Sequence, residues 1–122
     1  MRSEPARLSI QLIRSYDYFK EAADDLLALG VGIQVDGQPK GTGVGDPTAR
    51  TAEQRERYLD EVRVVDEALK AVPEEYRDIV LRWVKDGQPL DLIPGSEYAD
   101  RHTWQNHKRE LITEVARIKG WL

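Results

Sequence analysis

The stretch from Ala99 to Leu122, ADRHTWQNHKRELITEVARIKGWL, decides the fold expected for this chain. Its apolar residues recur at steps of seven, four, three and four, which is the spacing of one buried stripe on an α-helix. The members of this stripe are Trp104, Leu111, Val115, Ile118 and Leu122. At about 100° per residue, the opposite side of the helix carries His102, Asn106, Arg109 and Thr113, with Gln105 near its edge. Such a helix fits a DNA major groove, and it is equally compatible with a hydrated outer face that binds nothing.

The composition is that of one small, helix-rich globular domain. The 122 residues are 40% hydrophobic and 33% charged. The chain has no cysteine, which excludes a disulfide framework and a thiolate metal site. It has no run of about 18 apolar residues, so no membrane partner is expected. The first residues lack the apolar core and cleavage site of a signal peptide, and we therefore expect a cytoplasmic protein.

Residues 1–30 are predicted to form a long N-terminal helix that begins at Glu4-Pro5 and ends at Gly30. Its apolar positions are Leu8, Leu12, Tyr16, Phe19, Ala23 and Leu26. This seam fits a partner helix within the chain or in a second copy, which would give a homodimer. Residues 31–46 hold five of the nine glycines and are predicted to be a flexible loop. Because the loop lacks the spacing of a phosphate-binding motif, no nucleotide cofactor is expected.

Residues 47–122 are predicted to contain the other three helices. The second helix opens at Asp46-Pro47 and runs to Val72. The third begins at Pro73-Glu74-Glu75 and closes at Asp86-Gly87, and the last is capped by Ser96 or Asp100. Between them, residues 88–95 (QPLDLIPG) contain two prolines and cannot form a normal helix, although Leu90, Leu92 and Ile93 are expected to be buried. No segment alternates with period two, so the predicted fold class is an all-α, four-helix small domain.

The inventory of reactive side chains argues against catalysis. His102 and His107 are five residues apart and face different sides of the helix, whereas a helical metal pair needs a spacing of about three or four. No cysteine is present to act as a nucleophile, and none of the serines sits in a Gly-x-Ser-x-Gly turn. We therefore predict a protein that is not an enzyme and that holds neither a metal nor a cofactor.

Residues 46–122 resemble the phage and prophage transcriptional regulators of the RinA and ArpU type, which are related to region four of bacterial sigma factors. The resemblance rests on Asp46-Pro47-Thr48, on Val72-Pro73-Glu74-Glu75-Tyr76-Arg77, and on Ala99-Asp100-Arg101-His102-Thr103-Trp104 leading into Lys108-Arg109. It implies that residues 47–122 form a sigma-like, helix-turn-helix-like DNA-binding region. It also implies that the partner is promoter or operator DNA, with RNA polymerase as a further candidate. The chain departs from the family where QPLDLIPG replaces the regular helix that precedes the last one.

The charge distribution agrees with an interaction surface at the C-terminal end. From Arg101 onward there are five lysines and arginines against two glutamates, a net +3, whereas the first hundred residues carry thirteen against twenty, a net −7. In helix-turn-helix proteins the N-terminal half of the recognition helix contacts base edges. The expected base contacts are Arg101, His102, Gln105, Asn106 and Arg109, and the expected phosphate contacts are Thr103 and Lys108.

Two functional hypotheses remain open from the sequence. The first is a phage-derived, DNA-binding transcriptional regulator of the late-gene activator type that reads DNA with its last helix. The second is a helical interaction or assembly protein of a phage, either a small packaging subunit or a module that docks on RNA polymerase. It would read no DNA sequence. The acidic first hundred residues and the long N-terminal seam favour the second hypothesis.

Overall fold

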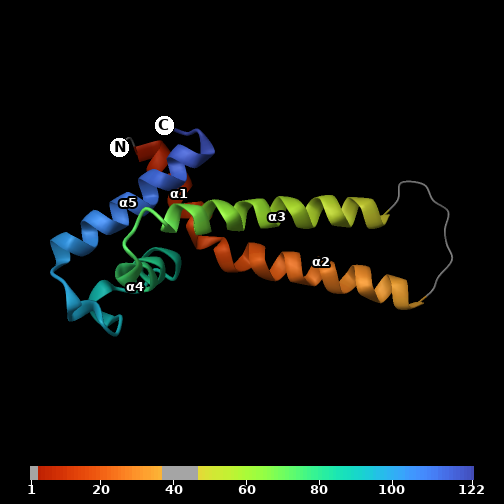
Figure 1. Cartoon of the computed structure of the whole chain (residues 1–122), viewed down its shortest axis with the longest axis horizontal. Coiled ribbons are helices and arrows are strands. Elements are labelled where there is room, and N and C mark those ends of the chain that lie inside the picture. The colour runs from red at the N-terminus through yellow and green to blue at the C-terminus, as the bar shows by residue number, and fades with distance from the viewer. Residues whose placement is uncertain (1–2, 37–46) are drawn as a thin grey trace. The chain divides into compact units, whose positions relative to one another are not determined.

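The computed structural model describes residues 3–36 and 47–122, and within these ranges every regular element is helical (Figure 1). The elements are α1 (Ser3–Arg14), α2 (Tyr16–Asp36), α3 (Pro47–Leu69), α4 (Glu74–Lys85), the 3-10 turns η1 (Leu90–Leu92) and η2 (Ser96–Tyr98), and α5 (Arg101–Lys119). The predicted all-α class is confirmed, because these residues contain no strand. Across the described ranges, no helix has both the length and the apolar character that crossing a membrane requires.

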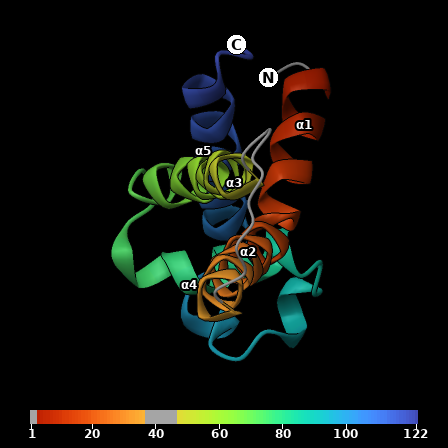
Figure 2. The same ribbon diagram turned by 90° about the vertical axis from the view of Figure 1, so that its right-hand side faces the viewer.

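The chain forms two compact units, whose boundary falls inside α3 rather than at residue 47. The C-terminal unit combines Met1–Tyr16 with Arg63–Leu122, and the hairpin unit is Asp17–Val62. In the C-terminal unit α1 packs against α4 and α5, and α4 packs against α5. Figure 2 shows α1 next to α5. The last helix is therefore covered by the first helix of the chain.

The expectation of one N-terminal helix over residues 1–30 is wrong, because two helices, α1 and α2, cover this stretch. At Ser15 the backbone N–H is shared between the carbonyls of Gln11 and Leu12, and the hydroxyl donates to the Gln11 carbonyl at 3.0 Å. A serine bonded back in this way bends or interrupts a helix. The second helix, α2, continues past Gly30 to Asp36, since a glycine weakens a helix by about 1 kcal/mol without ending it. The remaining part of the expected loop, 37–46, lies outside the described residues.

The core of the C-terminal unit draws on all of its α-helices. The side chains with no exposed surface include Ile13 from α1, Val65 from α3, Val80 from α4, and Leu111 and Val115 from α5. Between α3 and α4, the Arg77 guanidinium donates to the Val72 carbonyl at 2.7 Å, which holds the turn at Pro73 where α4 was predicted to begin. The buried stripe predicted for the last helix thus packs against a core built by the rest of this unit.

The proline-containing connection between α4 and α5 is held by side chains at both of its ends. Leu90 and Ile93 are buried as predicted, but Leu92 is 70% exposed because η1 turns Leu90 and Ile93 toward the core and leaves Leu92 outside. The Trp104 indole N–H donates to the carbonyls of Ser96, at 2.7 Å, and Ala99, at 3.1 Å. As predicted, this connection forms no regular helix: two 3-10 turns occupy it, and Trp104 attaches them to α5.

Both ends of α5 are defined by local backbone chemistry. Of the two predicted caps, Asp100 is the one used: its carboxylate accepts the Thr103 N–H at 2.8 Å. At the other end Gly120 adopts a left-handed conformation (φ 77°) that ends the helix and turns the chain away. The expectation that Leu122 continues the buried stripe is therefore wrong, and its side chain is 64% exposed.

We expect Asp100→Ala to lower the melting temperature (Tm) at neutral pH, because Thr103 then loses its capping acceptor. The Thr103 N–H holds the pKa of the Asp100 carboxyl below its usual value. A lowered folded-state pKa gives stability that is present above the unfolded-state pKa and is lost as the pH falls through the folded-state pKa. The Tm deficit of Asp100→Ala should therefore shrink below a pH of about 4. Thermal unfolding followed by circular dichroism measures this, and Asp100→Asn, which keeps an acceptor, should match the parent at pH 7. Equal Tm values for Asp100→Ala and the parent at pH 7 would contradict the cap.

We expect Trp104→Phe to lower the free energy of unfolding by about 1–3 kcal/mol, since it leaves the Ser96 and Ala99 carbonyls without their donor. Urea denaturation measures the change. Trp83→Phe removes the same atoms from a half-buried ring on α4 and serves as the matched control, with a smaller expected loss. Equal losses in the two variants would mean that ring volume, and not the indole N–H, holds the connection.

Candidate nucleic-acid interface

The predicted DNA contacts all lie between Arg101 and Arg109, in the first half of α5. The structure does not place them on one face. Those with exposed side chains are Arg101, His102, Gln105 and Arg109. Those with half-buried side chains are Thr103, Asn106 and Lys108. The set therefore divides into an outer face and two flanks.

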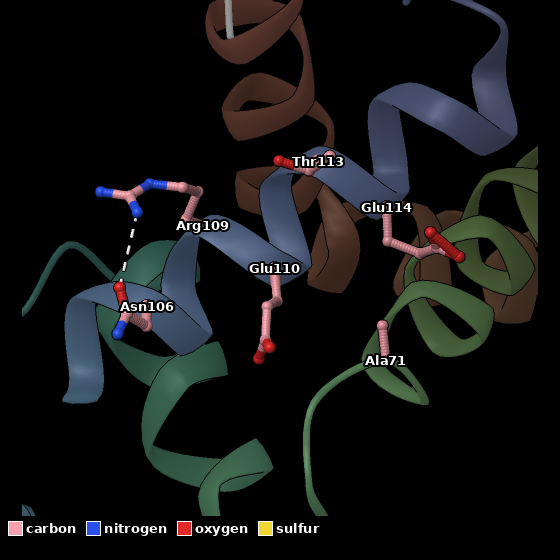
Figure 3. A pocket seen from close by; sticks show the side chains of 6 residues that line it. All are labelled: Ala71, Asn106, Arg109, Glu110, Thr113 and Glu114. Atoms are coloured by element: carbon pink, nitrogen blue, oxygen red, sulfur yellow. Dashed lines mark hydrogen bonds between the residues drawn. The ribbon is translucent and has the colours of Figure 1, made fainter.

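The outer face consists of His102, Gln105, Asn106 and Arg109. Along it, the Asn106 side-chain oxygen accepts a hydrogen bond of 3.4 Å from the Arg109 guanidinium (Figure 3). This contact is long for a hydrogen bond, so it orients the guanidinium without using up its donors. Arginine and the carboxamides are the side chains that read guanine and adenine by paired hydrogen bonds. The outer face thus carries the chemistry that the sequence predicted for base contacts.

Arg101 lies at the start of α5, and its guanidinium is 3.3 Å from the carboxylate of Asp91 on η1. Both side chains are largely exposed, and an ion pair of this kind is worth little in water. A phosphate can therefore replace Asp91 at small cost. Thr103 is different, because its backbone N–H is already taken by Asp100 and only its hydroxyl remains for a phosphate.

Lys108 lies on the flank of α5 that faces α1. Its ammonium is 4.4 Å from the centre of the Trp83 ring, a cation–π contact. Burial, and then the positive charge of Arg14 on α1, lower the pKa of the Lys108 ammonium. An open hollow on this flank, the α1–α5 groove, is lined by Ala6, Gln105, Lys108, Arg109 and Ile112.

The opposite flank of α5 is acidic. A second open hollow there is lined by Ala71, Asn106, Arg109, Glu110, Thr113 and Glu114 (Figure 3). The Glu110 carboxylate is 2.6 Å from the His107 ring nitrogen, and Glu114 pairs through both oxygens with Arg117, which lowers the pKa of the Glu114 carboxyl. Figure 3 shows the Arg109 guanidinium beside Asn106, at the far end of this hollow from Glu114. The two flanks of α5 therefore differ in charge.

Two residues near this surface were not predicted from the sequence. His107 has a side chain that is only 14% exposed and a ring 4.2 Å from that of Tyr76, so its role is packing. Arg14 comes from the first helix, and its positive charge acts on Lys108 because the fold packs α1 against α5. A helical wheel of α5 gives no sign of a neighbour so distant in sequence.

The exposed half of α5 offers hydrogen-bond donors and acceptors to a polar ligand. In residues 3–36 and 47–122, no three histidine, cysteine or acidic side chains gather in a way that could hold a metal ion. Comparisons with models of protein families, with curated proteins and with solved structures find no match to this chain. Functional inference therefore depends on the chemistry of α5 and its neighbours.

Proposed function

We propose that this protein binds double-stranded DNA through α5 and regulates transcription, in the manner of the phage late-gene activators that residues 46–122 resemble. The observation that carries the proposal is the outer face of α5, where Gln105, Asn106 and Arg109 lie together on a helix whose other side is fixed in the core. A base-reading helix needs both properties, because side chains select a sequence only when their backbone is held in place.

The proposed docking is a helix-in-groove contact rather than a standard helix-turn-helix one. In a helix-turn-helix the two helices are joined by a turn of about three or four residues. Here α4 and α5 are joined by residues 86–100, which include η1 and η2. The support for α5 comes instead from α1, from α4 and from the bonds of Trp104 to the connection. A major groove about 12 Å wide admits a helix presented in this way.

Because the net charge of the chain is −4, DNA binding would depend on cations that are gathered locally. A nucleic-acid-binding domain is usually basic, since phosphate contacts supply most non-specific affinity. In this chain the positive charge gathers on α5, with a net +3 from Arg101 onward. We therefore infer modest non-specific affinity and a strong dependence on the base contacts of the outer face.

A triple variant, Gln105→Ala with Asn106→Ala and Arg109→Ala, should lose sequence-specific DNA binding while keeping its helical content. Each good side-chain–base pair discriminates by about 1–3 kcal/mol, so removing the set erases selectivity. The parent first selects its preferred duplexes from a random library, and fluorescence anisotropy then compares both proteins on a selected and a scrambled duplex. Arg117→Ala, exposed on the same helix, is the control and should behave as the parent. A triple variant that discriminates like the parent would refute the base-reading role.

A second candidate function, a phage interaction or assembly protein, is favoured by the hairpin unit. There Tyr18, Phe19 and Tyr58 form an aromatic cluster, yet Tyr18 is 60% exposed and Leu27 is 51% exposed. Among the side chains described in this unit, the buried apolar ones are Ala23 and Val62. A core this small favours a partner for the unit, either a second copy of the chain or RNA polymerase.

If the hairpin unit joins two copies, light scattering of the parent should show a dimer, and Tyr18→Ser should shift it toward a monomer. The dimer should persist as salt rises, because an apolar helix contact responds little to ionic strength, whereas phosphate-mediated binding weakens steeply. Asp24→Ser, an exposed change on the same helix, is the matched control. A parent that stays monomeric at high protein concentration would exclude the homodimer.

A further inference from the structure

An open hollow between α2 and α3 of the hairpin unit combines aromatic rings with carboxylates. It is lined from α2 by Tyr18, Glu21 and Asp25, and from α3 by Gln54 and Tyr58. The half-buried side chains of Ala22 and Leu26 complete the lining. We call this site the tyrosine–acid hollow. All of its residues belong to the hairpin unit, so that unit alone forms it.

The aromatic side of the hollow is held in place by contacts within the hairpin unit. The rings of Tyr18 and Tyr58 meet edge-on with their centres 6.1 Å apart, and Phe19 stacks on Tyr58 at 5.7 Å. The Gln54 amide donates to the Tyr58 hydroxyl at 3.0 Å. Tyr18 nevertheless stays 60% exposed, so much of its ring is free to contact a ligand. The face of an aromatic ring is electron-rich and attracts cations.

The acidic side of the hollow consists of two exposed carboxylates on α2, Glu21 and Asp25. They are four residues apart, a spacing at which like charges on a helix repel each other. None of the salt bridges among the described residues includes either carboxylate. A cation bound between them would remove the repulsion, and it would lie beside the ring of Tyr18.

The charge of the hairpin unit favours a basic ligand. Residues 17–62 carry five lysines and arginines against ten acidic residues, a net charge of −5, whereas the rest of the chain has a net charge of +1. A guanidinium group fits the hollow better than an ammonium group does, because it stacks flat on an aromatic ring and donates two N–H groups to a carboxylate. Tyr18 and Leu26 add apolar surface for the residues that flank such an arginine.

A second copy of the chain fits this hollow poorly. In a twofold dimer the same surface of each copy meets at the axis. A dimer centred on the hollow would therefore bring four carboxylates together, and each hairpin unit already has a net charge of −5. Such an arrangement is repulsive, so the charge favours a partner of a different sequence.

We propose that the tyrosine–acid hollow receives an arginine side chain from a basic segment of another protein. The guanidinium lies against the ring of Tyr18 and pairs with Glu21 and Asp25. This inference rests on the second candidate function, in which the hairpin unit binds a partner, and it identifies the chemistry of that partner. It does not depend on DNA binding by α5.

The test uses a defined peptide, the acetylated and amidated pentapeptide SLRLS, and a twin that carries neutral citrulline in place of arginine. NMR titration of the isotope-labelled full chain should show saturable shifts of the Tyr18, Glu21 and Asp25 amide signals with SLRLS and much smaller ones with the twin. Equal shifts with both peptides would overturn the proposal, because the charge of the arginine would then contribute nothing.

Matched variants separate the hollow from the general charge of the hairpin unit. Glu21→Gln with Asp25→Asn should weaken SLRLS binding about tenfold or more, since two charge-assisted contacts are lost. Asp24→Asn with Glu53→Gln removes the same charge from exposed positions outside the hollow and should bind nearly as the parent does. Equal losses in the two double variants would overturn the proposal.

Two further comparisons test the tyrosine ring and the structural role of the acids. Tyr18→Ser should weaken SLRLS binding about two- to fivefold, as expected for an exposed cation–π contact, whereas Tyr18→Phe keeps the ring and should bind as the parent does. Glu21→Gln with Asp25→Asn should leave the Tm no lower than that of the parent, because it removes a repulsion. A lower Tm would show that the carboxylates stabilise the fold and would count against a binding role.

The remaining outcomes identify the occupant. If light scattering shows a parent dimer that SLRLS dissociates and the citrulline twin does not, the occupant is a second copy and the proposal is wrong. If acetylarginine amide binds as tightly as SLRLS, the hollow is a small-molecule site and the assignment to a protein segment is wrong. A parent dimer that does not bind SLRLS would overturn the arginine site and leave the partner-binding role of the hairpin unit intact.

Discussion

The hydrogen bonds from the Trp104 indole to the carbonyls of Ser96 and Ala99 are the contacts on which the C-terminal unit depends. Residues 86–100 contain no α-helix, so they cannot satisfy their backbone groups by helical pairing. Trp104 is 1% exposed, and its ring meets Tyr76 of α4 edge-on at 5.2 Å. One side chain of α5 therefore fixes the irregular connection and the angle at which α4 and α5 meet. Trp104 is buried on the inner side of α5 and thereby anchors the helix that carries the outer face.

Much of α5 was predictable because its determinants are local. The stripe of Trp104, Leu111 and Val115 follows from helical spacing, and the cap at Asp100 follows from the preference of helix starts for a short acceptor side chain. The prediction failed at Leu122 because the apolar spacing continues past Gly120 in the sequence, whereas the chain turns away from the helix at that glycine. It failed at Ser15 for a related reason: apolar spacing continues across the break, but the serine hydroxyl competes for the Gln11 carbonyl.

The candidate site was less predictable than the fold, because charge acts between elements that are distant in sequence. A helical wheel groups Gln105, Asn106 and Arg109 correctly, since one helix carries them. It cannot show that Lys108 packs on Trp83 of α4 or that burial, and then the charge of Arg14 on α1, lower the pKa of Lys108. By contrast, the pairing of Glu114 with Arg117 on the far flank follows from their i,i+3 spacing on one helix. The sequence therefore predicted the base-reading chemistry, while the burial of Lys108 against Trp83 emerged only from the packing of the helices.

The different charges of the two flanks of α5 affect how an acidic protein would bind DNA. A chain with net charge −4 gains little from general attraction to phosphate, so its cations must be placed where a phosphate lies when the bases are in register. Arg109 and Gln105 border both the α1–α5 groove and the outer face, which links the two kinds of contact sterically. A strand whose phosphate met Lys108, the contact expected from the sequence, would bring base edges to Gln105 and Arg109, and a strand shifted along α5 would lose these contacts. In the proposed complex, phosphate binding would therefore set the register in which bases are read.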